Sequence, residues 1–173
     1  FTYIGKLTSG TGTLNVVKSG AGDLTLSGDN SGLTGTVTVS GGRVLFGSEN
    51  AGSASAAWDL TTTENLFNMD AGGTGKTLHL GSLTGSAGSI LRNGGNASGT
   101  TTFQVGALGA STTFAGAIRD FDSNTTAALA KVGGGTLTLT GANNYSGATT
   151  VSAGVLNIQN SSALGSTAGA TTV

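Results

Sequence analysis

Residues 131–158 read KVGGGTLTLTGANNYSGATTVSAGVLNI, and an earlier stretch of the chain follows the same pattern. Residues 18–28 read KSGAGDLTLSG and match residues 131–141, KVGGGTLTLTG, at a constant spacing. The first copy holds Lys18, Gly20, Gly22, Leu24, Leu26, Gly28, Asn30, Gly35, Val39 and Gly42, and the second holds Lys131, Gly133, Gly135, Leu137, Leu139, Gly141, Asn143, Gly147, Val151 and Gly154 in the same order. A long unit that recurs in this way indicates a repeat architecture.

Each copy is expected to fold into short strands. Apolar residues alternate with polar ones or run together in Leu24–Leu26, Val37–Val39 and Val44–Phe46, and glycine or asparagine separates most such runs. Three runs make a turn of about 20–25 residues, which is the scale of one coil in a solenoid. We therefore predict an all-β fold, a parallel β-solenoid of about eight or nine coils, with leucine and valine facing inward and threonine outward.

The chain is expected to form one solenoid domain over residues 1–173. It divides into a partial repeat unit (1–17), repeat copy one (18–58), inter-repeat coils (59–128) and repeat copy two (129–173). Because both ends fall inside a unit, we expect the solenoid to join end to end with copies or continuations of itself.

The composition limits the classes of function. The chain has 32 glycines, no proline or cysteine, 9% charged residues and a net charge of −1. Its few cations form no basic stripe, so nucleic-acid binding is not expected. No apolar run approaches the roughly 20 residues that span a bilayer. The lack of cysteine excludes disulfides and thiol chemistry.

Residues 131–158 closely resemble the autotransporter-associated β-strand repeat, also called the passenger-associated transport repeat. Its pattern is K-x-G-x-G-T-L-x-L-x-G-x-N-x-Y-x-G-x-T-x-V-x-x-G-x-L, and Tyr145 occupies the tyrosine position. The first copy departs from it at two places, where Asp23 replaces the threonine and Leu33 stands in place of the tyrosine. The resemblance implies a right-handed β-helix in a secreted or surface-anchored bacterial protein. It also implies a part in passenger folding and export, no enzymatic activity and no cofactor.

Two acidic or glycine-rich stretches could carry chemistry. Asp120, Asp122 and Asn124 open like a calcium loop, but Thr125 and Lys131 replace the glycine and glutamate that such a loop needs. A solvated corner is favoured over a weak calcium site. Residues 70–77, DAGGTGKT, nearly match a phosphate-binding loop, but Asp70 replaces its first glycine and a strand follows it instead of a helix. A glycine-rich turn is favoured there.

The remaining candidates favour structural roles. His79 is the only histidine and is expected to face outward between two leucines. Trp58 and Tyr145 are expected to pack within the solenoid, although Trp58 could also contact a ligand. Lys18 and Lys131 are predicted to be solvent-facing corner residues. The threonine pairs, such as those of residues 136–140, could bind ice, but the leucine-containing strands interrupt the series.

These observations favour a structural protein, an extracellular rod that forms a stalk or fibre segment. The alternative is an adhesin-type module that recognises a glycan or a host surface. A polysaccharide-active enzyme comes third, because such sites gather several acids on one face and the eight acids of this chain are dispersed.

Overall fold

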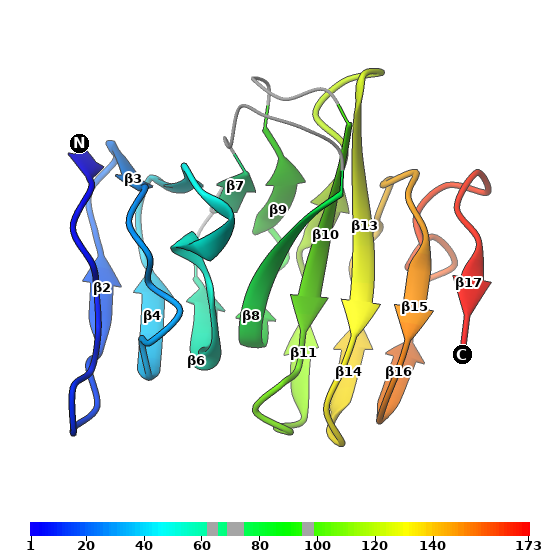
Figure 1. The fold of residues 1–173 in the computed structure, drawn as a ribbon. Helices are drawn as coiled ribbons and strands as arrows, with labels where there is room; N and C mark the ends of the chain where they lie inside the picture. The colour runs from blue at the N-terminus through cyan, green and yellow to red at the C-terminus, as the bar shows by residue number, and fades with distance from the viewer. Residues whose placement is uncertain (62–65, 69–74, 95–98) are drawn as a thin grey trace.

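The computed structural model describes residues 1–61, 66–68, 75–94 and 99–173, which form a rod with the two termini at opposite ends (Figure 1). Apart from a single 3-10 turn at Glu49–Ala51, the regular elements in these ranges are all strands. No helix among them is long and apolar enough to cross a membrane. The strand pairings are parallel, so the predicted all-β parallel solenoid is confirmed.

One side of the rod is a six-stranded sheet, which we call face A. Successive turns of the chain each add one strand to it, and these strands lie side by side along the rod. Face A consists of β1 (Thr2–Tyr3), β3 (Asp23–Leu26), β5 (Arg43–Phe46), β7 (Leu66–Asn68), β9 (Ile90–Asn93) and β12 (Ala117–Arg119).

The other sheet has eleven strands and divides into two rows at the long strand β8 (Lys76–Gly85). Face B contains β2 (Val16–Lys18), β4 (Gly35–Val39), β6 (Ser53–Leu60), the second half of β8, β11 (Thr112–Phe114), β14 (Thr136–Leu139) and β16 (Val155–Ile158). Face C contains the first half of β8, β10 (Gly99–Val105), β13 (Thr125–Lys131), β15 (Thr149–Val151) and β17 (Thr171–Thr172).

Alternation along each strand sends every second side chain into a narrow core. On face B, Phe114 lies beside Leu139 and both are fully buried, whereas the neighbouring Thr113 and Thr138 point away from the core. Burying one such leucine or phenylalanine contributes about 1.5–3 kcal/mol. The same core includes Leu26, Val37, Val39, Val44, Phe46, Leu60, Leu78, Leu80, Leu83, Phe103, Val105, Leu129 and Leu137. Leu24 is only partly buried.

The predicted number of coils was too high. The solenoid has about six turns. The estimate of eight or nine assumed that every coil is as short as those of the repeats. The inter-repeat coils are longer because they contain β8, with ten residues, and β10, with seven.

Corresponding strands of the two repeat copies lie on different faces. In the first copy, Leu24 and Leu26 belong to β3 on face A. In the second copy, the corresponding Leu137 and Leu139 belong to β14 on face B. The interval between the copies is therefore not a whole number of turns, and the second copy is turned by one face relative to the first.

Candidate functional site

The repeat lysines point inward and bind backbone carbonyls. Lys131 Nζ donates to the carbonyl oxygens of Val132 at 2.7 Å, Gly133 at 2.7 Å and Ala153 at 3.1 Å. Ala153 lies on the following coil. The ammonium therefore closes the glycine turn that begins the repeat and also ties that turn to the next coil.

Lys18 makes the corresponding bonds in the first copy. Its Nζ donates to the carbonyl oxygens of Ser19 at 3.0 Å, Gly20 at 2.7 Å and Gly41 at 2.8 Å. The glycine two positions after each lysine has a positive φ, 75° at Gly20 and 68° at Gly133, which turns its carbonyl toward the ammonium.

The prediction that these lysines face solvent was wrong. Lys131 is 1% exposed, and burial lowers the pKa of its ammonium. Its position follows from strand alternation, because Lys131 is the register partner of the buried Val105 and of Val151. Lys18 is half-buried and pairs with the buried Val39. All the hydrogen bonds described for the two ammonium groups go to carbonyls, which satisfy the charge without a carboxylate.

The repeat asparagines join three successive coils. Asn143 Oδ1 accepts a hydrogen bond from the backbone N–H of Ile118 at 2.7 Å, and Asn143 Nδ2 donates to the carbonyl of Ala163 at 2.6 Å. Ile118 is on the preceding coil and Ala163 on the following one. Asn143 is 4% exposed, so both bonds are shielded from water.

Asn30 has the same arrangement in the first copy. Its Oδ1 accepts from the backbone N–H of Leu7 at 2.8 Å, and its Nδ2 donates to the carbonyl of Ala51 at 3.2 Å. Asn30 is fully buried. In each repeat, the asparagine side chain thus satisfies one corner carbonyl and one corner amide that have no partner in the strand ladder.

Two repeat glycines are required because another backbone passes against them. A Cβ built on Gly28 would lie 1.9 Å from the carbonyl oxygen of Gly5, and one built on Gly141 would lie 1.9 Å from that of Gly116. No rearrangement of a flexible side chain could relieve these contacts. The echo between Tyr3-Ile4-Gly5 and Phe114-Ala115-Gly116 in the sequence therefore has a structural reason, since both stretches carry the glycine on which a repeat stacks.

Tyr145 fills the corner of the second copy. It is fully buried, and its hydroxyl lies 2.6 Å from Thr149 Oγ1, which is 1% exposed. Burial raises the pKa of the Tyr145 phenol, while the hydrogen bond to Thr149 opposes that shift. Leu33, the residue that stands in its place in the first copy, is also fully buried. The predicted packing of Tyr145 is confirmed.

The departure of the first copy at Asp23 is matched by a change on the next coil. Asp23 is the register partner of Arg43, and the two form a bidentate ion pair. The hydrogen bond from Arg43 lowers the pKa of the Asp23 carboxyl. In the second copy the corresponding register partners are Thr136 and Val155, which are uncharged.

Of the predicted calcium residues, Asp120 and Asp122 accept hydrogen bonds from backbone N–H groups of their own corner and of the following coil. Asp120 Oδ1 accepts from Ala127 N at 2.6 Å, and Asp120 Oδ2 accepts from Ser146 N at 3.0 Å. Asp122 Oδ1 accepts from Asn124 N at 2.9 Å. Within the described ranges, no group of three or more His, Cys, Asp or Glu side chains could hold a metal ion. The geometry favours the solvated corner.

Of the remaining sequence candidates, Trp58 lies in the core, whereas His79 faces outward between the buried Leu78 and Leu80, as predicted. Trp58 is 1% exposed and packs edge-on against Phe46, with 5.2 Å between the ring centroids. His79 is half-buried, and its Nδ1 lies 2.9 Å from Gln104 Oε1 on the adjacent strand. Residues 70–74 of the phosphate-loop-like stretch lie outside the described residues.

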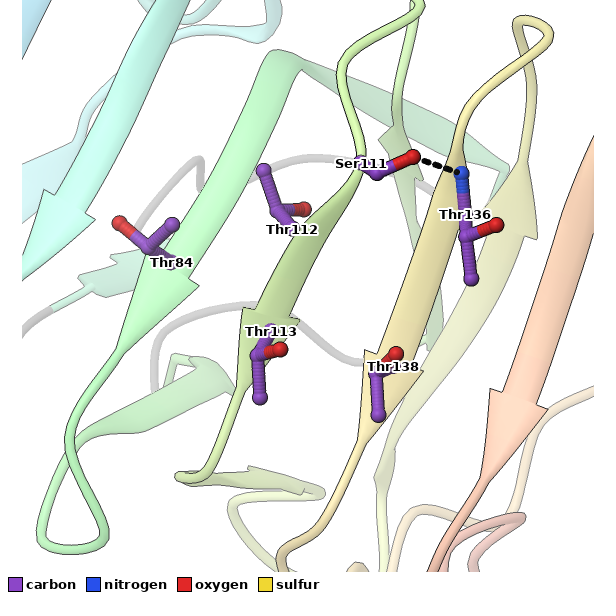
Figure 2. Close-up of a pocket in the computed structure, with 6 residues that line it drawn as sticks. All are labelled: Thr84, Ser111, Thr112, Thr113, Thr136 and Thr138. Carbon is purple, nitrogen blue, oxygen red and sulfur yellow. Dashed lines mark hydrogen bonds between the residues drawn. The ribbon is translucent and has the colours of Figure 1, made fainter.

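An open groove with a volume of about 430 Å³ lies on face B (Figure 2). Six hydroxyl-bearing residues of β8, β11, β14 and the turn before β11 line it: Thr84, Ser111, Thr112, Thr113, Thr136 and Thr138. Thr84 Oγ1 donates to Asp59 Oδ1 at 2.7 Å. Ser111 Oγ accepts from Thr136 N at 3.1 Å (Figure 2). The lining carries no charge and no aromatic ring.

Sequence reasoning located the repeat positions but missed the roles of the lysines and asparagines. Both are polar residues at fixed places in an apolar pattern, and nothing in the sequence says which backbone groups they reach. Strand alternation was a usable signal for the lysines, since in the second copy Leu129 and Lys131 fall on the same side of one strand.

Comparison with known proteins agrees with this arrangement. The sequence model of the Passenger-associated-transport-repeat matches residues 16–45 and 129–158. The chain is 37% identical, over 158 residues and 90% of its length, to a protein named adhesin BmaC autotransporter from Brucella suis biovar 1 (strain 1330). The matched region is 4% of the length of that relative. No solved structure matches the chain significantly.

The repeat lysines and asparagines bind each coil to its neighbours. The chain is therefore a β-solenoid built on a long sequence repeat. That repeat is the passenger-associated transport repeat, which the chain carries twice.

Proposed function

We propose that this chain is a structural segment of an extracellular passenger, a rod that carries length and rigidity and continues end to end into further coils. The observation that carries the proposal is the direction of the side chains that the two repeats share. The lysines and asparagines point into the solenoid and bind neighbouring coils. Because the second copy is turned by one face, the outer residues of the two copies do not form one shared surface.

Most of the exposed large apolar side chains lie in the first and last coils. Of the eight large hydrophobic side chains that are exposed in the described ranges, six belong to the first or last coils. They are Phe1 (83% exposed), Ile4 (81%), Val17 (66%), Val155 (53%), Ile158 (46%) and Val173 (97%).

Sedimentation velocity over a wide concentration range tests this proposal. We expect the chain to self-associate and Ile158→Glu to weaken the association, because a charge would then lie at the open end of the core. Leu108→Glu is the matched control, since Leu108 is 47% exposed but lies in a lateral turn. A chain that stays monomeric at every concentration, or an equal effect of both substitutions, would contradict the proposal.

Adhesin-type binding is the second candidate, and the hydroxyl-lined groove of face B favours it. The curated relative is named an adhesin. Neutral hydroxyl groups can exchange hydrogen bonds with the hydroxyls of a glycan or with a host surface. A glycan array read with the wild type and with Thr113→Lys tests it, because a lysine at that position would obstruct the groove. Binding that is absent, or that the substitution leaves unchanged, would exclude the groove as the site.

A catalytic role is the weakest of the three. Acid catalysis on glycans needs two carboxyl groups at a defined separation on one face. The carboxylates at Asp23 and Asp120 are instead engaged by Arg43 and by backbone amides. The non-catalytic role is further supported by the passenger-type relative.

A further inference from the structure

The hydroxyl-lined groove of face B lies in the middle of the rod, where two successive coils diverge. Leu80 of β8 pairs with Val105 of β10, and Gly85 of β8 pairs with Phe114 of β11. Between these two pairs β8 has four residues, whereas the next coil has eight. Because the longer segment cannot stay in register with the shorter one, it leaves the sheet at residues 106–111 and returns at β11. The groove is the gap that this detour leaves.

The gap closes where β11 meets the end of β8. Within the described ranges, Gly85 and Phe114 are the one register pair that joins these two strands. Ala115 N donates to Gly85 O at 2.9 Å, and a Cβ on Gly85 would lie 2.6 Å from the Phe114 ring, so the strands touch there. Thr112 and Thr113 pair with β14 but not with β8. The edge of β11 that faces β8 therefore borders the groove at these two residues.

Thr112 interrupts an apolar column of the core. It is the register partner of Leu137, which is 1% exposed, so its side chain belongs to the inward column of face B. Counted back from the pair of Gly85 and Phe114, Leu83 is the residue of β8 in this column. The column holds only apolar residues on the other coils: Val16, Val37, Trp58, Leu83, Leu137 and Leu156.

The hydroxyl of Thr112 therefore lies at the floor of the gap. Thr112 is half-buried and lines the groove, because no residue of β8 pairs with it and covers it (Figure 2). An apolar side chain here would close the core, as in the neighbouring coils. The threonine instead places a hydroxyl at the point where the groove reaches the inward layer of the sheet.

The six hydroxyls that line the groove fall into two groups. Hydrogen bonds to neighbouring protein groups are made by the hydroxyls of Thr84, Ser111 and Thr138. Within the part of the chain that the structure describes, no hydrogen bond is made by the hydroxyls of Thr112, Thr113 and Thr136. Because a hydroxyl both donates and accepts, these last three can bind a ligand without breaking a bond within the protein.

The chemistry of the lining selects a neutral ligand that carries hydroxyls. A charged ligand would lose hydration without meeting an opposite charge, since the described residues that line the groove are uncharged. A sugar presents hydroxyls that donate and accept in the same way as those of the groove. The volume of the groove, about 430 Å³, also lies in the range of sites that hold small ligands.

We propose that the gap between β8 and β11 binds a segment of a neutral glycan. A sugar ring lies against the floor of the gap, where its hydroxyls exchange hydrogen bonds with Thr112, Thr113 and Thr136. This inference rests on the adhesin-type binding considered above as the second candidate function. It adds the class of ligand, which is a neutral glycan, and the place, which is the interruption of the sheet at Thr112.

NMR titration with oligosaccharides tests the proposal. The probes are unbranched oligomers of glucose, galactose and mannose, with oligogalacturonate as the acidic counterpart. Thr112→Val keeps the shape of the side chain and removes its hydroxyl, so we expect the affinity for a neutral probe to fall about fivefold to tenfold. Thr38→Val is the matched control, because Thr38 lies on face B in β4 but outside the groove, and it should leave the affinity unchanged.

A second variant separates loss of the site from loss of the fold. Thr112→Leu restores the apolar column and fills the floor of the gap, so it should abolish binding while the urea midpoint stays the same or rises. Neutral probes that bind Thr112→Val and Thr112→Leu as tightly as the wild type, or binding of the acidic probe alone, would overturn the inference and leave adhesin-type binding intact. If no glycan on an array binds the wild type, both the inference and adhesin-type glycan binding are wrong.

Discussion

Lys18 and Lys131 bind the same three kinds of carbonyl: that of the next residue, that of the glycine after it, and one on the following coil. The two lysines lie on different faces of the rod, so their shared geometry comes from the repeat and not from a shared position in the sheet. Each repeat therefore supplies its own hydrogen bonds between successive coils, on whichever face of the rod it lies. This independence allows such repeats to be separated by coils of other length and sequence.

Replacing Lys131 tests the carbonyl contacts. Lys131→Met keeps the length of the side chain but removes all three donors, leaving carbonyls of the glycine turn without their partner. We expect a loss of about 1–3 kcal/mol in the free energy of unfolding, measured by urea denaturation. Lys18→Met should cost less because Lys18 is half-buried and lies near the end of the rod. An equal or smaller effect at Lys131 would show that the bonds contribute little.

Asn143→Ala should destabilise the solenoid by about 2–4 kcal/mol, because it leaves the Ile118 amide and the Ala163 carbonyl unpaired in the core. Asn144→Ala is the matched control, since Asn144 is exposed and its described hydrogen bond is made by its backbone. Thermal unfolding of the two variants gives the comparison. Similar melting temperatures would refute the role of the repeat asparagine.

Gly141→Ala should be among the most damaging single substitutions. The added Cβ would meet the backbone of Gly116, so one coil would have to move away from the next, at a cost of about 3–5 kcal/mol. Gly134→Ala in the same repeat should be nearly neutral, because nothing lies within 4 Å of the added atom. Denaturant midpoints measure both, and a tolerated Gly141→Ala would mean that these coils are less tightly stacked than described.

Because the phenol of Tyr145 is buried, we expect the stability of the fold to fall at alkaline pH. The pKa of its phenol is raised above the ordinary value of 10.0, so the folded state holds the proton more tightly than the unfolded state does. This contribution to stability is fully present below pH 10 and is lost as the pH rises through the folded-state pKa. Tyr145→Phe should lose less stability than the wild type across that range. Unfolding curves at a series of alkaline pH values test this, and parallel pH profiles would be the contrary result.

Much of the fold could be predicted from the sequence, because alternation in strands such as Leu137–Leu139 and glycine punctuation report local geometry directly. The number of turns could not, since it depends on how far β8 and β10 extend, which strand pairing decides. The lysine contacts were also missed. A charged side chain predicts exposure unless the carbonyls that satisfy it are known, and those of Val132, Gly133 and Ala153 converge only once the coils are stacked. The placement of the second copy on different faces from the first could not be predicted either, because it depends on the lengths of the intervening coils.

The most direct test is whether the repeat side chains hold successive coils together. It is made by measuring the free energy of unfolding of the double variant Lys131→Met/Asn143→Ala. Its control is Thr138→Ala/Thr150→Ala, two outward substitutions in the same repeat. We expect the inward pair to lower the urea midpoint strongly and the outward pair to change it little. If the inward pair unfolds at the same urea concentration as the wild type, the residues that define the repeat do not hold the coils together.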